Sequence, residues 1–293
     1  MSKKTTEEPS HLMLHIVLVL FTLLSMYPIL WVFTIALSGK QSLAISLLPP
    51  DPGLWDRIRA ILPWPAEFSF SNFSSVLKDQ PFARWLLNSA IVAAATTVVG
   101  VFLSCTAAYA FSRFRFPGRR VGLMSFLISQ MFPSTLMLIP LYIILVKWLG
   151  LGSSRLGLIL VYATTSIPFC VWMLKGYFDT IPKDLEESAV MDGASAGTIF
   201  FRIILPLAKP AVAVTALFSF MTGWNEFILA ATFMDKELMY TAPVGLRFFV
   251  GGFSQQWGYF AAGSIIVSIP VVALFMYLQK YLVSGLTAGA VKG

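Results

Sequence analysis

The sequence predicts an all-α integral membrane protein with six transmembrane helices and both termini in the cytoplasm. Three observations lead to this fold class. First, 57% of the 293 residues are hydrophobic and 12% are charged, whereas soluble domains carry about 25% charged residues. Second, the apolar residues gather in runs of roughly 20 residues or more, the length of helix that crosses a bilayer. Third, arginines concentrate in one short loop, which fixes the orientation.

The net charge of +7 indicates lysines and arginines at the cytoplasmic surface of a membrane, because in an apolar chain this is a commoner cause of positive charge than nucleic-acid binding. Cys105 and Cys170 both fall inside apolar runs and fit no metal-ligand spacing. We therefore expect no nucleic-acid partner and no metal site.

The polar segment 1–13 is expected to be cytoplasmic, in agreement with Lys3 and Lys4. The first span, 14–37, is too long for a signal-peptide core and lacks a cleavage site after it, so it is predicted to remain as an anchor. Segment 39–84 is broken by prolines and rich in aromatic residues, which favours an ordered cap on the outer interface.

The second span, 85–111, repeats small residues every three to four positions, which favours a face packed against another helix. The alternative is that membrane helices merely tolerate alanine and glycine. The small residues are Ala93, Thr97, Gly100, Ser104 and Ala108. Four arginines follow within 113–120, a strong cytoplasmic marker.

Counting onward from that loop gives the remaining topology. Segments 150–155 and 232–257 are expected outside, while segment 178–206 and the tail 284–293 are expected inside. Prolines within several spans predict interrupted helices in a bundle. The remaining predicted spans are 121–148, 156–174, 210–231 and 259–281.

The polar segment 185–206 is the best candidate for contact with soluble machinery. Asp184, Glu186 and Glu187 are typical of the first turn of a helix, which we predict over 183–192. Gly193 stands where a left-handed cap would end that helix, and Ser195 can cap a second one.

One side of the first helix is predicted to carry Leu185, Ala189 and Asp192 at i, i+4 and i+7. A small residue such as Ala189 would let this helix seat in a cleft of a partner. The chain holds no G-x-x-x-x-G-K-[ST] motif, so it is not expected to bind ATP itself.

At this loop the sequence resembles the binding-protein-dependent ABC importer permeases of the type I fold. Ser188 departs from the usual alanine of their EAA motif. The positions that match the motif are Glu187, Ala189, Gly193, Ile203, Leu205 and Pro206. The likeness to the carbohydrate branch of the family extends over nearly the whole chain, through segments 68–73, 85–89, 107–113, 224–227, 257–262 and 285–293.

The resemblance implies a multi-pass subunit in a bacterial or archaeal cell membrane, with no covalent chemistry of its own. Its implied partners are a second permease, a homodimeric ATPase that holds ATP and Mg²⁺, an extracytoplasmic solute-binding protein and an oligosaccharide, maltose or maltodextrin. The implied ATPase-coupling residues are Glu187, Ser188, Ala189, Asp192, Gly193, Ile203, Leu205 and Pro206. The implied contacts to the binding protein are Gly251, Gly252, Phe253, Ser254, Gln255, Gln256 and Trp257, and the tail 285–293 would reach towards the ATPase.

Three polar residues inside the spans are candidates for lining a sugar path: Gln130, Asn225 and Glu226. Glu226 is the one acid within an apolar span, and about 16 residues of helix place it about 24 Å above Pro210, near the outer interface. Structural or hydration roles for it stay open. An ion-coupled secondary sugar transporter is the alternative function, but it would need mid-membrane acids or internal repeats.

Overall fold

The computed structural model describes residues 11–43, 51, 53–65, 67–252 and 255–290. The predicted roles of Phe253 and Ser254, and those of segments 1–10 and 291–293, fall outside the described residues. The regular secondary structure of the described ranges is helical, and the one extended contact within them is an isolated bridge between Ser38 and Ser69. The all-α fold class is therefore confirmed.

The chain divides into two compact units, one of residues 1–80 with 246–266 and one of 81–245 with 267–293. The first unit holds α1 (His11–Leu37), α2 (Leu54–Ile61) and α3 (Ser71–Lys78). No part of the most apolar stretch of α1 is buried within the protein, which is typical of a helix that lies in lipid.

Hydrogen bonds tie the short helices of the first unit to α1. The Asn72 side chain in α3 donates to the carbonyl of Ala36 at 3.0 Å and accepts from Gln41 Nε2 at 2.7 Å. The Tyr27 hydroxyl donates to the carbonyl of Ile61 at 2.8 Å, at the end of α2. Both helices lie within the predicted outer cap, 39–84.

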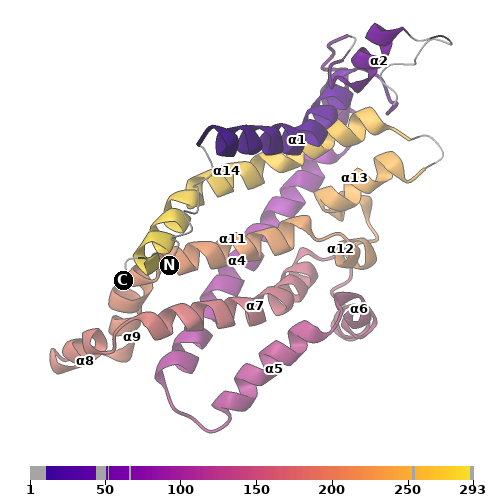
Figure 1. The fold of residues 1–293 in the computed structure, drawn as a ribbon. Helices are drawn as coiled ribbons and strands as arrows, with labels where there is room; N and C mark the ends of the chain where they lie inside the picture. The colour runs from indigo at the N-terminus through magenta and orange to yellow at the C-terminus, as the bar shows by residue number, and fades with distance from the viewer. Residues whose placement is uncertain (1–10, 44–50, 52, 66, 253–254, 291–293) are drawn as a thin grey trace. The chain divides into compact units, whose positions relative to one another are not determined.

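The second unit is built on α4 (Phe82–Arg113), α7 (Arg155–Thr180) and α11 (Lys209–Asn225), which pack side by side (Figure 1). A Cβ at Gly100 would lie 2.8 Å from Ser219 Oγ, and one at Gly223 would lie 3.2 Å from the Cα of Ala93. Larger residues would hold these helices apart. The predicted small-residue face of the second span is thus confirmed as a packed face.

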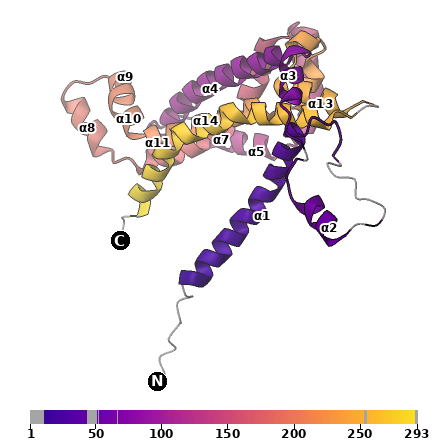
Figure 2. The ribbon, with the colours of Figure 1, turned by 90° about the horizontal axis from the view of Figure 1, so that it is seen from above.

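Shorter elements surround these three helices. α8 and α9 lie beyond one end of α4 and α7 in both views (Figures 1 and 2). Two helices have residues in both units, α13 (Ala242–Val250) and α14 (Trp257–Ala290). The other elements of the second unit are α5 (Arg119–Met131), α6 (Ser134–Tyr142), η1 (Ile143–Trp148), α8 (Asp184–Met191), α9 (Ala196–Ile199), η2 (Phe200–Ile204), α10 (Leu205–Leu207), α12 (Ile228–Phe233) and η3 (Glu237–Met239).

Among the described residues, four helices are long and apolar enough to cross a membrane, or up to six spans if two bent helix pairs count as one each. This is compatible with the predicted six. The predicted third span, 121–148, bends by 107° between α5 and the segment that follows, where Phe132 is extended because Pro133 disfavours a helical conformation of the residue before it.

The predicted fifth span, 210–231, is corrected. It is not one helix, because α11 ends at Asn225, Glu226 is extended, and α12 begins at Ile228. Glu226 itself explains the break, since its carboxylate accepts the backbone N–H groups of Leu229 and Ala230 at 2.8 and 3.0 Å. The first N–H groups of α12 have no carbonyl partner within the helix, and the Glu226 carboxylate satisfies two of them.

The loops of the second unit gather at its two ends as the topology count requires. At one end, Asn88 donates to the carbonyls of Leu238 and Tyr240, both at 2.9 Å, and accepts from Arg155 Nε at 3.0 Å. At the other end, the arginine loop meets segment 178–206, where Arg113 donates to the carbonyl of Ile181 at 2.9 Å. The loops predicted outside and those predicted inside are therefore separated.

Candidate functional site

α8 is a short helix with a glycine stop. Gly193 has φ +81°, its N–H donates to Val190 at 2.9 Å, and the N–H of Ala194 donates to Ala189 at 2.9 Å. These two bonds form a Schellman motif, which satisfies the last carbonyls of the helix. The predicted left-handed cap is confirmed, and a residue with a Cβ would cost about 1–2 kcal/mol there.

The second helix of the loop begins at Ser195. The Ser195 hydroxyl accepts the N–H of Thr198 at 3.3 Å, as predicted for a cap. The chain then runs through α9, η2 and α10 and buries Ile199, Phe200 and Ile204. The Phe200 ring lies 5.0 Å from that of Tyr109 on α4. The loop is thereby packed onto the bundle rather than hanging free.

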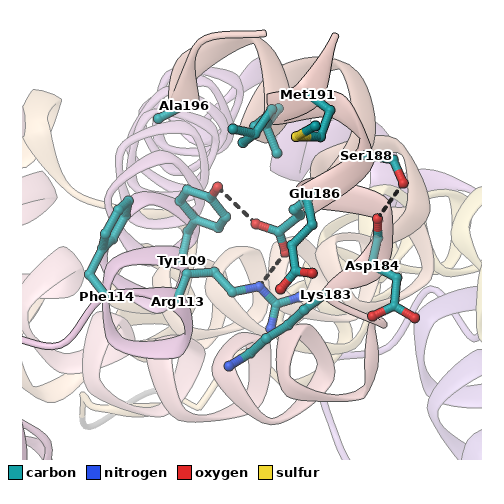
Figure 3. Close-up of a pocket in the computed structure, with 12 residues that line it drawn as sticks. Tyr109, Arg113, Phe114, Lys183, Asp184, Glu186, Ser188, Met191 and Ala196 are labelled. Atoms are coloured by element: carbon teal, nitrogen blue, oxygen red, sulfur yellow. Dashed lines mark hydrogen bonds and ion pairs between the residues drawn. The ribbon is translucent and has the colours of Figure 1, made fainter. Parts of the chain in front are cut away.

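A buried ion pair fixes α8 to the end of α4. Arg113 Nε pairs with Glu186, and the two side chains are 7% and 13% exposed. The Tyr109 hydroxyl donates to the other carboxylate oxygen of Glu186 at 3.1 Å (Figure 3). Because the guanidinium also donates to the carbonyl of Ile181 at 2.9 Å, one side chain joins α4, α8 and the end of α7.

A second polar contact lies beside the first. The Ser112 hydroxyl donates to Asp179 at 2.6 Å, and Lys175 Nζ lies 2.5 Å from the same carboxylate. Asp179 therefore ties α7 to the last turn of α4, next to the Arg113 contacts.

A hollow of about 740 Å³ opens between the end of α4 and the α8–α9 turn (Figure 3). Its floor carries the Arg113–Glu186 pair, and its rim carries exposed apolar side chains, of which Met191 is 87% exposed. The residues that line it are Tyr109, Arg113, Phe114, Lys183, Asp184, Glu186, Glu187, Ser188, Val190, Met191, Ala196 and Ile199. Exposed apolar side chains with charged residues beside them are typical of a protein-binding surface.

The residues that the EAA resemblance singles out divide into two sets. Ala189, Ile203 and Leu205 pack against the buried core and hold the loop in place. The exposed set is Glu187, Ser188, Asp192, Gly193 and Pro206. The three residues predicted to share one side of the helix therefore differ in exposure. Leu185 and Asp192 are exposed, while Ala189 packs against the core. The Ser188 hydroxyl donates to the carbonyl of Asp184 at 2.8 Å (Figure 3), so this departure from alanine is satisfied within the helix.

The three candidates for the sugar path occupy different surroundings. Glu226 caps α12 and also accepts the Tyr162 hydroxyl at 2.8 Å. Gln130 is exposed and donates to the carbonyl of Thr165 at 3.1 Å, and Asn225 is exposed at the end of α11. Within the described part of the chain, no hydrogen bond joins any two of the three.

The segment between α13 and α14 holds the predicted contacts to a binding protein. Gly251 and Gly252 are exposed at its start. Gln255 accepts the Trp257 indole N–H at 3.0 Å, and the N–H of Gln256 donates to Phe249 at 2.7 Å. Elsewhere, over the residues that the structure describes, no group of three His, Cys, Asp or Glu side chains could hold a metal ion.

Comparison with known proteins now decides the family. Residues 100–288 match the family described as the inner membrane component of binding-protein-dependent transport systems. The chain belongs to this family. It is therefore a permease-type subunit of the inner membrane, in agreement with its long apolar helices.

Similar permeases match along nearly the full chain. The galactooligosaccharide permease GanQ of Bacillus subtilis is 38% identical, covering 95% of this chain and 94% of GanQ. The trehalose permease SugB of Mycobacterium tuberculosis is 35% identical, covering 92% and 93%. The maltose/maltodextrin permease MalG of Escherichia coli is 36% identical, covering 95% of each.

Two solved structures share the fold. One is a crystal structure of a bacterial ABC transporter involved in the import of the acidic polysaccharide alginate, with a TM-score of 0.75 and 25% identity over 92% of this chain and 95% of that one. The other is a bacterial alginate ABC transporter in complex with a pentasaccharide-bound periplasmic protein, with a TM-score of 0.59 and 16% identity over 72% and 81%.

In this permease, sequence reasoning missed the Arg113–Glu186 pair. Two adjacent glutamates looked alike, although Glu186 is nearly buried and Glu187 is exposed. The available signal was an arginine at the last turn of one helix and an acid at the first turn of another, at the same predicted membrane face.

Proposed function

We propose that this chain is the membrane-spanning permease subunit of an ATP-driven sugar importer and forms half of its translocation pore. Family membership supports the importer, and the sugars named for GanQ, SugB and MalG support the substrate class. These relatives differ in substrate, so the sugar class is proposed as an oligosaccharide, with maltodextrins as the first to test.

The observation that carries the proposal is the exposed α8–α9 turn at the end of the bundle. We expect it to be rigid, because the Gly193 stop and the Ser195 cap are both hydrogen-bonded and its second half is buried. It presents apolar and acidic side chains around a hollow. A rigid, exposed helical turn of this kind suits a soluble partner, and we assign it to a separate homodimeric ATPase that binds ATP and Mg²⁺.

The remaining partners follow from the same importer architecture. A second permease would complete the pore, and an extracytoplasmic solute-binding protein would deliver the sugar to the outer loops. The alginate transporter with its bound periplasmic protein is a precedent for the latter contact. In this chain, segment 251–257 is the proposed contact.

The Arg113–Glu186 ion pair would transmit movement of the ATPase to the membrane helices. When the ATPase subunits close, they would displace α8, and Arg113 would carry that displacement to α4 because it holds Glu186 and Ile181 together. Asp179 would carry it to α7 through Ser112. Since α4, α7 and α11 are closely packed, they would move as one body and open the pore on the other side.

Transport by the reconstituted complex tests the proposal. Proteoliposomes that contain this permease and its partners are loaded with ATP and supplied with a panel of labelled sugars. Uptake should require both the ATPase subunit and internal ATP, and should survive an uncoupler. Uptake that proceeds without the ATPase, or that an uncoupler abolishes, would support the ion-coupled alternative instead.

A further inference from the structure

A second hollow of the molecule lies at the α4–α5 turn, apart from the α8 surface. It measures about 620 Å³ and is formed by the turn, the first residues of α5 and one side of α7. The side chains that line it include three cations and no acid. Its lining residues are Phe116, Gly118, Arg119, Arg120, Val121, Leu123, Met124, Trp172 and Lys175.

Two of the cations are available to a ligand. Lys175 is already paired with Asp179 at 2.5 Å. Among the described residues, neither Arg119 nor Arg120 takes part in an ion pair. Arg119 Nε donates to the carbonyl of Phe111 at 2.8 Å, which fixes the guanidinium and leaves its terminal N–H groups to bind an anion.

The backbone at this place also favours an anion. Gly118 has φ +84° and immediately precedes α5, a helix of 13 residues. The first residues of α5 line the hollow together with Gly118. The N–H of Arg119 donates to the carbonyl of Phe116 at 3.3 Å, but the next N–H groups of this first turn have no partner within the helix, and the helix dipole favours negative charge there. Two arginines and a helix start therefore meet at one point.

An apolar strip leads away from this cationic end along α5. Val121 is 72% exposed and Met131 is 80% exposed, with Met124, Leu127 and Ile128 exposed between them. The spacing of three to four residues places these side chains on one side of the helix, over about 15 Å. The indole of Trp172, whose N–H donates to Leu123 at 3.2 Å, adds an amphipathic ring typical of a membrane interface.

A cationic end followed by an apolar strip fits one class of ligand, an amphiphile with an anionic phosphate headgroup. We infer that this hollow binds an anionic phospholipid of the cytoplasmic leaflet, with its phosphate at Arg119 and Arg120 and an acyl chain along α5. Basic hollows between membrane helices on that side suit such headgroups. The lipid would hold the arginine loop, and thus the end of α4, at a fixed depth.

The test measures lipid retained by the purified transporter complex. Complexes are extracted from bilayers of mixed phosphatidylglycerol and phosphatidylcholine, and bound lipid is counted by native mass spectrometry. The wild type should retain phosphatidylglycerol in preference to phosphatidylcholine. The double variant R119Q/R120Q should lose that preference by about thirtyfold, the effect of two arginines near a phosphate. R115Q is the matched control, since Arg115 is an exposed arginine of the same loop that lies outside the hollow.

A second variant and a competitor complete the test. R120E, on an exposed side chain, should lose the preference even if the double variant assembles poorly. Millimolar inorganic phosphate should leave the lipid in place, because the apolar strip contributes to its binding. Full displacement by inorganic phosphate would mean a free-phosphate site and would overturn the inference. Unchanged retention in R120E, or equal loss in R115Q, would overturn it as well. The readout is lipid binding, so it does not depend on whether transport is supported.

Discussion

The Arg113–Glu186 pair should hold α8 in its docked position. Breaking a buried ion pair from one side costs about 3–5 kcal/mol, because the remaining charge is left without compensation. The lower end applies here, since 13% of the Glu186 side chain stays exposed and Tyr109 still donates to it. We therefore expect Arg113→Gln to favour undocking of α8 by about 3 kcal/mol, or about 100-fold.

Hydrogen exchange measures this directly, because amides in a locally opening segment exchange in proportion to the fraction of time that the segment is open. In the assembled complex, the amides of α8 should exchange about 100-fold faster in Arg113→Gln, while those in the middle of α4 should not change. ATP hydrolysis should continue with reduced sugar uptake. Arg115→Gln, which removes an exposed arginine nearby, should behave like the wild type.

A double-mutant cycle measures the interaction energy between Arg113 and Glu186 apart from their contacts to other residues. Glu186→Gln keeps a hydrogen-bond acceptor for Tyr109 and removes the charge. Combined with Arg113→Gln, it should cost less than the sum of the single changes, with a coupling of about 0.5–3 kcal/mol. Strictly additive effects, or unchanged exchange of α8 in Arg113→Gln, would refute the reasoning.

Three further changes test other parts of the account. Gly193→Asp should insert normally but lose the ATPase in co-purification, whereas Gly150→Asp, at φ +64° and with equally open space, should keep it; equal loss in both would contradict the assignment of α8. Gly245→Ala places a Cβ 1.9 Å from the Trp85 ring and should lower stability by about 1–3 kcal/mol, so an unchanged melting temperature would disprove the close packing. Glu226→Ala should remove the α12 cap at about 0.5–2 kcal/mol and lower the melting temperature without changing the KM for sugar; a raised KM at unchanged stability would instead make Glu226 a pore ligand.

Local patterns in the sequence predicted much of the structure because they act over a few residues. The Gly193 stop and the Ser195 cap depend on near neighbours, and the structure confirms both. The small residues around Gly100 repeat at a helical spacing that is visible within one span, and the structure confirms that this face is packed. The break at Glu226 was missed, because hydropathy counts an acid as a minor interruption and does not register that it can cap a new helix.

Contacts between residues that are distant in sequence could not be predicted from local patterns. Arg113 and Glu186 are 73 positions apart, and either could equally have faced water. Tertiary contacts such as the packing of Phe200 against Tyr109 and the Ser112–Asp179 hydrogen bond bring the two helix ends together. For the same reason, the inward side of Ala189 could not be told from its outward one by spacing alone.

Cysteine cross-linking at α8 tests the central claim most directly. Met191→Cys places a thiol on the exposed rim of the hollow, and Leu149→Cys places one on an exposed residue that follows η1 at the opposite end. The native thiols, Cys105 and Cys170, are buried. In the intact complex, a short bifunctional maleimide should join Met191→Cys to the ATPase subunit, with a yield that changes on ATP binding, and should leave Leu149→Cys unjoined. An intact complex without the Met191→Cys product, or equal products from both positions, would contradict coupling through α8.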